Sequence, residues 1–384
     1  MRIYPIALIA LLSAGPAADV LAQVPPPNPT PAPRPAPQPA PTPSPAPAPR
    51  TPRIPRMDRD RDRARFEEVG RQTLTISNVK EIDLSNISGD VVILPGGGRD
   101  ASIEYTKRGR GDTVEEAKRQ LGLVEVSLNV TGDGHGAIRT HYRHGDAPIA
   151  APLEMPLPGP APQRRFRSSV DFRITTPPQT RIHVKTISGG IQVSKMKGDI
   201  ALEAVSGDIR IDGGGRVSLA KTISGDIDIS GIAAEEPLVA SSMSGTVTLR
   251  GLKARYLDVS SVSGDVVIKD VTCDRAELQT LSGDLEYAGQ LARSGRYELK
   301  AHSGDIRLAI SGDVGFDVDA NTFSGKIRSD LPIKNEAAEE QDSEIVAGGT
   351  RVRLPKRASF RGTYKDGSAT IELTTFSGNI VITK

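Results

Sequence analysis

Apolar and polar residues alternate in short segments along most of this chain, and each segment restarts after a Ser-Gly pair. In residues 221–229, Ile227 and Ile229 fall on one side and Asp226 and Asp228 on the other, which is the period-two pattern of a β-strand. Ser and Gly are turn residues, and Gly tolerates the backbone angles that a corner needs. The pattern therefore predicts short strands joined by Ser-Gly corners.

The Ser-Gly pair recurs at steps of 18 to 21 residues from residue 181 onward. One more copy follows an insertion, and an isolated copy lies upstream. The serines of these pairs are Ser188, Ser206, Ser224, Ser244, Ser263, Ser282, Ser303, Ser324, Ser377 and, upstream, Ser88. A degenerate turn at residues 197–200 falls halfway between two copies. This period predicts an all-β fold, a β-solenoid whose coils of about 18–21 residues each contain two strands and two corners.

A single coil cannot bury its own apolar side, so we expect the coils to stack around a narrow aliphatic core. The residues predicted to fill it are Val193, Ile209, Ile211, Ile227, Ile229, Val247, Leu249, Val266, Ile268, Leu285 and Ile306. The period is broken at residues 331–361, which predicts a surface insertion. Residues 370–383 resume the pattern, and we expect them to close the end of the stack.

Upstream of the repeats, residues 71–180 predict a β-rich cap region with one short helix. Thr113 can cap a helix over residues 113–121, with Glu116 three positions later. Residues 124–130 alternate as a strand, and a second strand contains Val170, Phe172 and Ile174. Between them, residues 146–163 are Pro-rich and aperiodic, which predicts a loop. The solenoid itself is expected over residues 181–384.

The first 70 residues have the composition of targeting and linker segments. Residues 1–22 have the pattern of a signal peptide, with Arg2, an apolar run and a small residue before Gln23. Residues 23–70 are rich in Pro and Arg and predict a disordered linker, extended as polyproline II where Pro dominates. Two alternatives stay open here: the Pro-rich part could dock on a Pro-binding partner, and Arg50 to Arg65 could bind an anionic envelope polymer.

Composition limits the function classes. The formal net charge is only +2 and aromatic residues make up 4% of the chain, with no Trp. Nucleic-acid sites need a basic field and stacking rings, so we expect no nucleic-acid partner. The single cysteine, Cys273, cannot form an intramolecular disulfide and is expected to be a small buried residue, with a reactive thiol as the alternative.

Three sequence blocks resemble a known family. They are Val170-Asp-Phe-Arg-Ile-Thr-Thr-Pro-Pro, Arg181-Ile-His-Val-Lys-Thr-Ile-Ser-Gly-Gly and the recurring Ser-Gly-Asp-Ile. They resemble the bacterial "putative adhesin" β-strand-repeat family, a domain family of unknown function, over roughly residues 70 to 384. The resemblance implies a right-handed β-helix-like solenoid in an exported or envelope-facing protein. It brings no catalytic residues with it.

The candidate site with the clearest pattern is a column of aspartates in one register of the repeat: Asp208, Asp226, Asp265, Asp284 and Asp305. Carboxylates stacked about 5 Å apart repel each other, and Ca²⁺ would relieve the repulsion. The alternative is that each carboxylate accepts a hydrogen bond from a turn amide and faces water. His141 and His144 share a loop with Asp146, but their spacing is not diagnostic of a metal site.

These observations predict a non-enzymatic exported protein of the periplasm or cell surface. It would present a repetitive surface in the manner of an adhesin to an envelope or surface polymer or protein. No catalytic residue, resident metal or cofactor, or transmembrane segment of the mature chain is expected. The alternatives are a structural, self-assembling envelope element and a polysaccharide-acting enzyme, which would need paired acids on one coil face.

Overall fold

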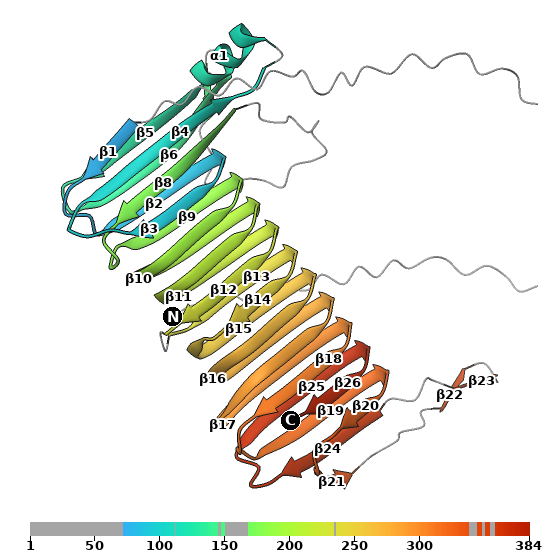
Figure 1. Cartoon of the computed structure of the whole chain (residues 1–384). Helices are drawn as coiled ribbons and strands as arrows, with labels where there is room; N and C mark the ends of the chain where they lie inside the picture. The colour runs from blue at the N-terminus through green and yellow to red at the C-terminus, as the bar shows by residue number, and fades with distance from the viewer. Residues whose placement is uncertain are drawn as a thin grey trace, which may run out of the picture. The chain divides into compact units, whose positions relative to one another are not determined.

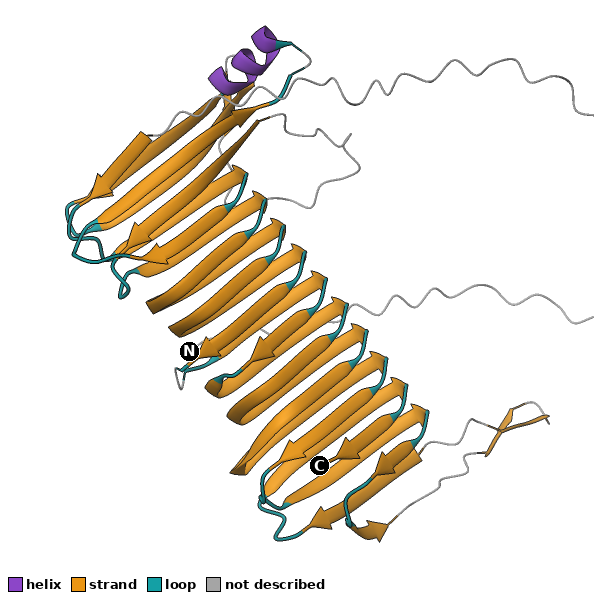
Figure 2. Cartoon of the chain, viewed as in Figure 1, coloured by secondary structure: helices purple, strands orange, loops and turns teal. Residues whose placement is uncertain are grey.

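The computed structural model describes residues 72–111, 113–144, 147–149, 168–233, 236–337, 344–347, 350–353 and 358–384. The predicted signal peptide, the Pro/Arg-rich linker and most of the predicted loop at 146–163 lie outside these residues. Within them the fold is all-β with one helix, as Figure 2 shows. The coiled repeat predicted from the sequence is therefore confirmed as an architecture.

The N-terminal part contains eight strands and the helix α1. Their bounds are β1 Gln72–Ile76, β2 Glu81–Ser88, β3 Val91–Pro95, β4 Ala101–Gly109, α1 Val114–Gly122, β5 Val124–Thr131, β6 His135–His144, β7 Ala147–Ile149 and β8 Ser168–Thr176. The central repeats follow as β9 Arg181–Ser188, β10 Ile191–Ser206, β11 Ile209–Ser224, β12 Ile227–Ile232, β13 Leu238–Ser244, β14 Val247–Arg250, β15 Lys253–Ser263, β16 Val266–Ser282, β17 Leu285–Ser303 and β18 Ile306–Ser311. The C-terminal part has β19 Phe316–Ser324, β20 Ile327–Ser329, β21 Lys334–Ala337, β22 Glu344–Ala347, β23 Thr350–Arg353, β24 Ala358–Tyr364, β25 Ala369–Ser377 and β26 Ile380–Thr383.

The repeats form two rows of parallel strands that meet at the Ser-Gly corner (Figure 1). The first row enters the corner: Leu202, for example, pairs with Val184 of the preceding coil. The second row leaves it, and Ile209 pairs with Ile191. Each coil contributes one segment to each row, so every coil is hydrogen-bonded to the coils on both of its sides.

The corner serines pair in register from coil to coil. Ser188 pairs with Ser206, and the copy that is isolated in the sequence, Ser88, pairs directly with Ser188. The strands β2 and β3 therefore form the coil that precedes β9 and β10 in the stack. The sheet is continuous across residue 180.

At the other end, the order of the coils in the stack differs from their order in the sequence. Ser303 pairs with Ser377, and Ser377 pairs with Ser324. The strands β25 and β26 thus lie between β17–β18 and β19–β20, so the expectation that residues 370–383 close the end is wrong. The end is covered instead by β24, antiparallel to β19, and by β21, antiparallel to β24. Both ends of the predicted insertion, residues 331–361, therefore contact the stack.

In five consecutive coils, the corner opposite the Ser-Gly pair has a second column of unusual backbone angles. Residues with positive φ recur there at the period of the repeat: Lys195 (52°), Gly213 (65°), Gly231 (66°), Gly251 (59°) and Asp270 (54°). The bend therefore begins slightly before the degenerate turn predicted at residues 197–200. Lys and Asp occupy left-handed geometry here although Gly suits it better.

All the predicted core residues, from Val193 to Ile306, are buried. The core is aliphatic along most of the stack and aromatic near its C-terminal end, where the rings of Tyr287 and Tyr297 meet edge to face at 5.7 Å. The predicted helix is confirmed as α1, whose cap Thr113 accepts a hydrogen bond from the Glu116 N–H at 3.2 Å. No helix in the described parts of the chain is long and apolar enough to cross a membrane.

Candidate functional site

The corner is held together by a close approach of backbones. Gly264 has φ of 152°, and a Cβ placed on it would lie 2.2 Å from the carbonyl oxygen of Gly245 in the preceding coil. No side chain fits there, so the glycine is fixed by the stacking itself. Two residues before most of the corner serines, a polar side chain is buried, and several of these donate to a corner carbonyl. Thr222 Oγ1, for example, donates to Gly207 O at 3.1 Å.

The predicted aspartate column lies just after the corner, and its carboxylates bind the backbone of the next coil. Oδ1 of Asp208 accepts the N–H of Asp226 at 2.9 Å, and Oδ1 of Asp265 accepts that of Asp284 at 2.8 Å. The same bond links Asp226 to Thr246, Asp284 to Asp305 and Asp305 to Asn379. This is the arrangement expected if each carboxylate accepts a turn amide.

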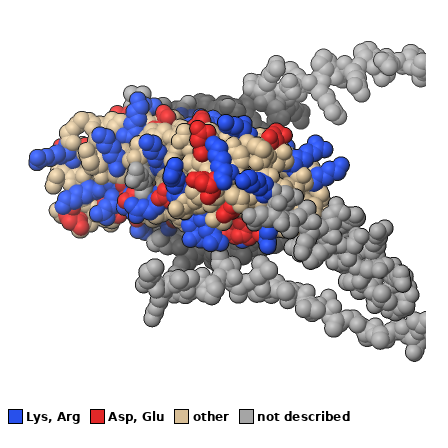
Figure 3. Space-filling view, turned by 90° about the horizontal axis from the view of Figure 1, so that it is seen from below, with Lys and Arg blue, Asp and Glu red and all other residues tan. Residues whose placement is uncertain are grey.

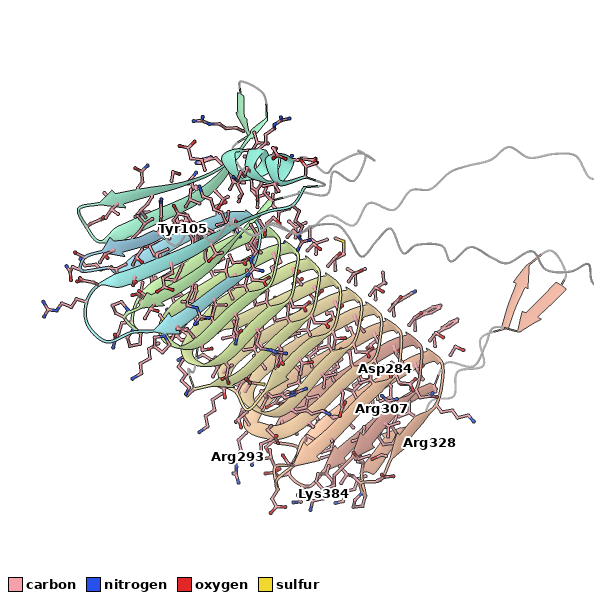
Figure 4. The ribbon with its side chains drawn as sticks, turned by 45° about the horizontal axis from the view of Figure 1, so that its top comes forward. Tyr105, Asp284, Arg293, Arg307, Arg328 and Lys384 are labelled. Atoms are coloured by element: carbon pink, nitrogen blue, oxygen red, sulfur yellow. The ribbon has the colours of Figure 1, made fainter. Side chains whose placement is uncertain are left out.

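One oxygen of each column carboxylate is thus already engaged, and some of the others contact arginine. Nη1 of Arg307 lies 3.0 Å from Oδ2 of Asp284, and both residues are labelled in Figure 4. Across the described residues, no group of three or more His, Cys, Asp and Glu side chains is placed to hold a metal ion. A calcium role for the column stays a prediction.

A second column, which the sequence reading missed, lies immediately before the corner serines. We call it the corner ladder, and its members are Ile187, Val205, Ile223, Met243, Val262, Leu281, His302, Phe376 and Phe323 in stack order. Five of them are largely exposed: Ile223 (39%), Met243 (52%), Val262 (46%), Leu281 (50%) and Phe376 (49%). Figure 4 shows a row of side chains projecting from the edge of the stack where the strands turn.

The aromatic end of the corner ladder is a stack of rings. The centroids of Phe323 and Phe376 lie 4.8 Å apart with ring planes 7° apart, and His302 stacks on Phe376 at 5.1 Å. Because these rings cover one another's faces, they present mainly their edges outward. That geometry does not suit a sugar or a base, which would need an open ring face. The sequence signal was present, since the residue before Ser is apolar in almost every repeat.

A third column was also missed, five residues before the corner serines on the outer face of the first row. We call it the carboxylate ladder: Asp258, Glu277, Glu298, Glu372 and Asp319. They pair in register through five consecutive coils, Asp258 with Glu277, Glu277 with Glu298, Glu298 with Glu372 and Glu372 with Asp319. At a strand spacing of about 4.8 Å, like charges directly opposite each other destabilise a sheet.

Neighbouring side chains contact parts of the carboxylate ladder. Tyr256 Oη donates to Glu277 at 3.0 Å, Lys300 forms an ion pair with Glu298, and Arg361 lies 2.8 Å from Asp319. Burial and the adjacent charge of Glu277 raise the pKa of Asp258. Burial, together with the bond to Glu277, raises the pKa of Tyr256 to about 12. Cations thus contact two of the five carboxylates, Glu298 and Asp319, and the row lies on a half-buried face.

Near the N-terminal end lies a groove of about 290 Å³, whose lining combines charged side chains with Ile187, Val205 and Ile223 of the corner ladder. His183 lies between Asp83 (Nδ1–Oδ1 4.0 Å) and Glu203 (Nε2–Oε1 3.5 Å), and Lys185 lies 3.2 Å from Glu203. Acidic and basic side chains are thus intermixed in this groove. Seen from below in Figure 3, basic and acidic side chains are likewise interspersed.

The remaining candidate residues, Cys273 and His141, do not form a shared site. Cys273 is buried, its Sγ lies 3.8 Å from Tyr287 Oη, and burial raises the pKa of its thiol to about 12. Such a thiol is not activated for nucleophilic chemistry. His141 contacts Ser127 Oγ at 3.0 Å, whereas Asp146, its predicted companion, lies outside the described residues.

A comparison of the sequence with known protein families supports the interpretation of the Ser-Gly-Asp repeat. Residues 216–383 match the model of the Toastrack DUF4097 family, which confirms the resemblance predicted from the Ser-Gly-Asp repeats. No curated protein matches the chain significantly in sequence.

Two solved structures are similar to the chain. A putative cell adhesion protein from Clostridium sporogenes is 10% identical, with 82% of this chain and 99% of that chain covered and a TM-score of 0.19. A putative adhesin from Bacteroides fragilis is 14% identical, with 83% of this chain and 98% of that chain covered and a TM-score of 0.36.

Proposed function

We propose that this chain, which carries a Toastrack DUF4097 domain at residues 216–383, is a non-enzymatic exported protein of the cell envelope or surface. It binds an envelope or surface polymer or protein through a repetitive face of the stack. The observation that carries this proposal is the carboxylate ladder, which repeats one charge in register through five coils.

Repetition of this kind suits a repetitive partner. A polymer that meets one acidic side chain about every 4.8 Å can make the same contact many times, and weak contacts add up to tight binding when they are linked. The stacked carboxylates cost folding free energy, since like charges repel across adjacent strands. The row of acids continues over consecutive coils in spite of this repulsion. A role in binding therefore explains it better than a role in stability.

The same geometry weighs against the enzyme alternative. A polysaccharide-cleaving site needs two carboxyl groups whose environments push their pKa values apart. On the carboxylate ladder Asp258 faces Glu277, which helps to raise its pKa, but the pair continues into Glu298, Glu372 and Asp319 as a row in which the same juxtaposition repeats. A polymer lying on such a row meets equivalent contacts instead of one reaction centre.

The proposal includes the export route and the geometry of the linker. The signal-peptide pattern of residues 1–22 supports secretion to the periplasm or the cell surface. Residues 23–70 would then form a Pro/Arg-rich spacer ahead of the stack. The right-handed sense of the coil, implied by the family resemblance, also belongs to this proposal.

The experiment that tests the function is retention of the purified full chain on isolated cell-wall sacculi and outer-membrane fragments. We expect retention that falls with salt, because charged contacts are screened, and no release of soluble sugar fragments during incubation. Release of soluble sugar products would establish the enzyme alternative. Recovery of all the protein in the unbound fraction at low salt would contradict surface binding.

A further inference from the structure

We infer that the corner ladder is the contact surface for a second copy of this chain, with the two stacks side by side and parallel. The inference does not depend on the proposed function, because the carboxylate ladder lies on the outer face of the first row and stays exposed in such a pair. It rests on the exposure, the length and the flanking charges of the corner ladder.

The first argument is the amount of apolar surface. Nine side chains at about 4.8 Å make a stripe about 38 Å long. With the largest members near half exposed, each side chain leaves about 70 Å² open, or about 600 Å² per copy. That reaches the upper size of an apolar patch on a typical monomer, about 300–600 Å². Two copies together would bury about 1,200 Å², the lower limit of a specific interface, so we expect a weak dimer.

The second argument is the repeat itself. A partner that contacts all nine side chains must have the same spacing over the whole stripe. A second copy has this spacing because its coils are identical. Identical stacked side chains can then interdigitate between the two edges, as in paired sheets of equal repeat. Small side chains next to the middle of the corner ladder allow the two copies to approach each other closely. They are Ser241 and Ser260, two residues before Met243 and Val262.

The third argument is charge complementarity, which also selects the orientation. In a parallel pair related by a two-fold axis along the stack, the column three residues before Ser faces the partner's aspartate column, coil by coil. Lys221 then faces Asp226 of the second copy, and Lys300, which also pairs with Glu298 of its own chain, faces Asp305. Glu203 would face Asp208, a like-charged pair that Lys185 offsets from 3.2 Å away, and each of the remaining pairs contains at least one uncharged residue. In an antiparallel pair centred on Val262, Asp265 would instead face itself.

Cysteine cross-linking on the full chain tests the inference, because Cys273 is buried and leaves no accessible native thiol. Leu281→Cys should form a disulfide-linked dimer under mild oxidation, since each copy meets its own equivalent in a parallel pair. Val130→Cys is the matched control: Val130 is 51% exposed but lies on β5, away from the corner ladder. It should form no disulfide-linked dimer.

Two further outcomes decide against the inference. If Leu281→Cys fails to cross-link with itself but cross-links with Met243→Cys, the pair is antiparallel and the assigned orientation is wrong. If sedimentation of the unmodified chain gives a monomer up to about 100 μM, a concentration at which a weak interface of this size would associate, the second copy is not the occupant. Where dimers do form, Met243→Ser with Leu281→Ser should weaken them at least tenfold, and Val130→Ser should not.

Discussion

The backbone N–H of Asp226 donates to Oδ1 of Asp208 at 2.9 Å, across 18 residues of sequence. This single contact explains why the repeat has Asp after Gly: the carboxylate of one coil binds the amide of the next. The hydrogen bond also uses an oxygen that a cation would otherwise coordinate. Two consequences can be measured.

Calcium should have little effect on the stability of the stack. We expect the thermal midpoint of unfolding to be the same in millimolar Ca²⁺ and in chelator, since amide donors already compensate the column. A rise in the midpoint with Ca²⁺ that chelator reverses would instead establish the cation role of Asp208, Asp226, Asp265, Asp284 and Asp305. Asp226→Asn, which keeps the acceptor and removes the charge, should be near neutral, and Asp226→Ala should cost about 1 kcal/mol.

The corner glycines should tolerate no side chain. Gly264→Ala places a Cβ 2.2 Å from Gly245 O at a φ of 152°, so the two coils must separate. We expect a loss of at least about 3 kcal/mol in the free energy of unfolding, measured by urea denaturation. Gly97→Ala is the control, because nothing lies within 4 Å of its new Cβ. Equal effects of the two substitutions would show that the corner is not closely packed.

The carboxylate ladder should make stability depend on pH. Burial and Glu277 raise the pKa of Asp258, so the folded state favours its protonated form. The group's stabilising contribution is present at acidic pH, below its unfolded pKa, and is lost as pH rises through the folded value. Asp258→Asn should therefore raise the free energy of unfolding at pH 7 by about 0.2–1 kcal/mol, and the thermal midpoint should rise with it. The gain should shrink toward pH 4, and a gain independent of pH would contradict the charge-based account.

Cys273 should react only when the protein unfolds. Because burial raises the pKa of its thiol to about 12, the thiolate is scarce at neutral pH and the sulfur is inaccessible. We expect no labelling by iodoacetamide at pH 8 under native conditions and complete labelling in denaturant. Rapid native labelling would revive the reactive-thiol alternative.

The parts of the fold that follow from local pattern could be predicted from the sequence. Alternation identified Ile227 and Ile229 as core, and Thr113 with Glu116 identified the start of α1, because both signals depend on nearby residues only. The order of the coils could not be predicted. Every coil offers the same kind of hydrogen-bonding edge, so the period does not show that β25 lies between β17 and β19.

The candidate site was likewise only partly predictable from the sequence. The Asp after Gly stands out in the sequence, and its carboxylate accepts a backbone N–H of the next coil. The carboxylate ladder does not form a regular feature of the sequence repeat, because Leu219 and Val239 occupy the same position in earlier coils. Only the stacking of Glu298 on Glu372, 74 positions apart in sequence, makes the row continuous.

The measurement that tests the proposed binding face most directly is retention on isolated envelope material of the double variant Glu298→Gln with Glu372→Gln. Glu104→Gln, which removes an acid from β4 outside the ladder, is the matched control. We predict that the double variant loses at least tenfold in affinity while circular dichroism shows the stack intact, and that the control binds like the unmodified chain. Equal binding of all three proteins would contradict the carboxylate ladder as the binding face.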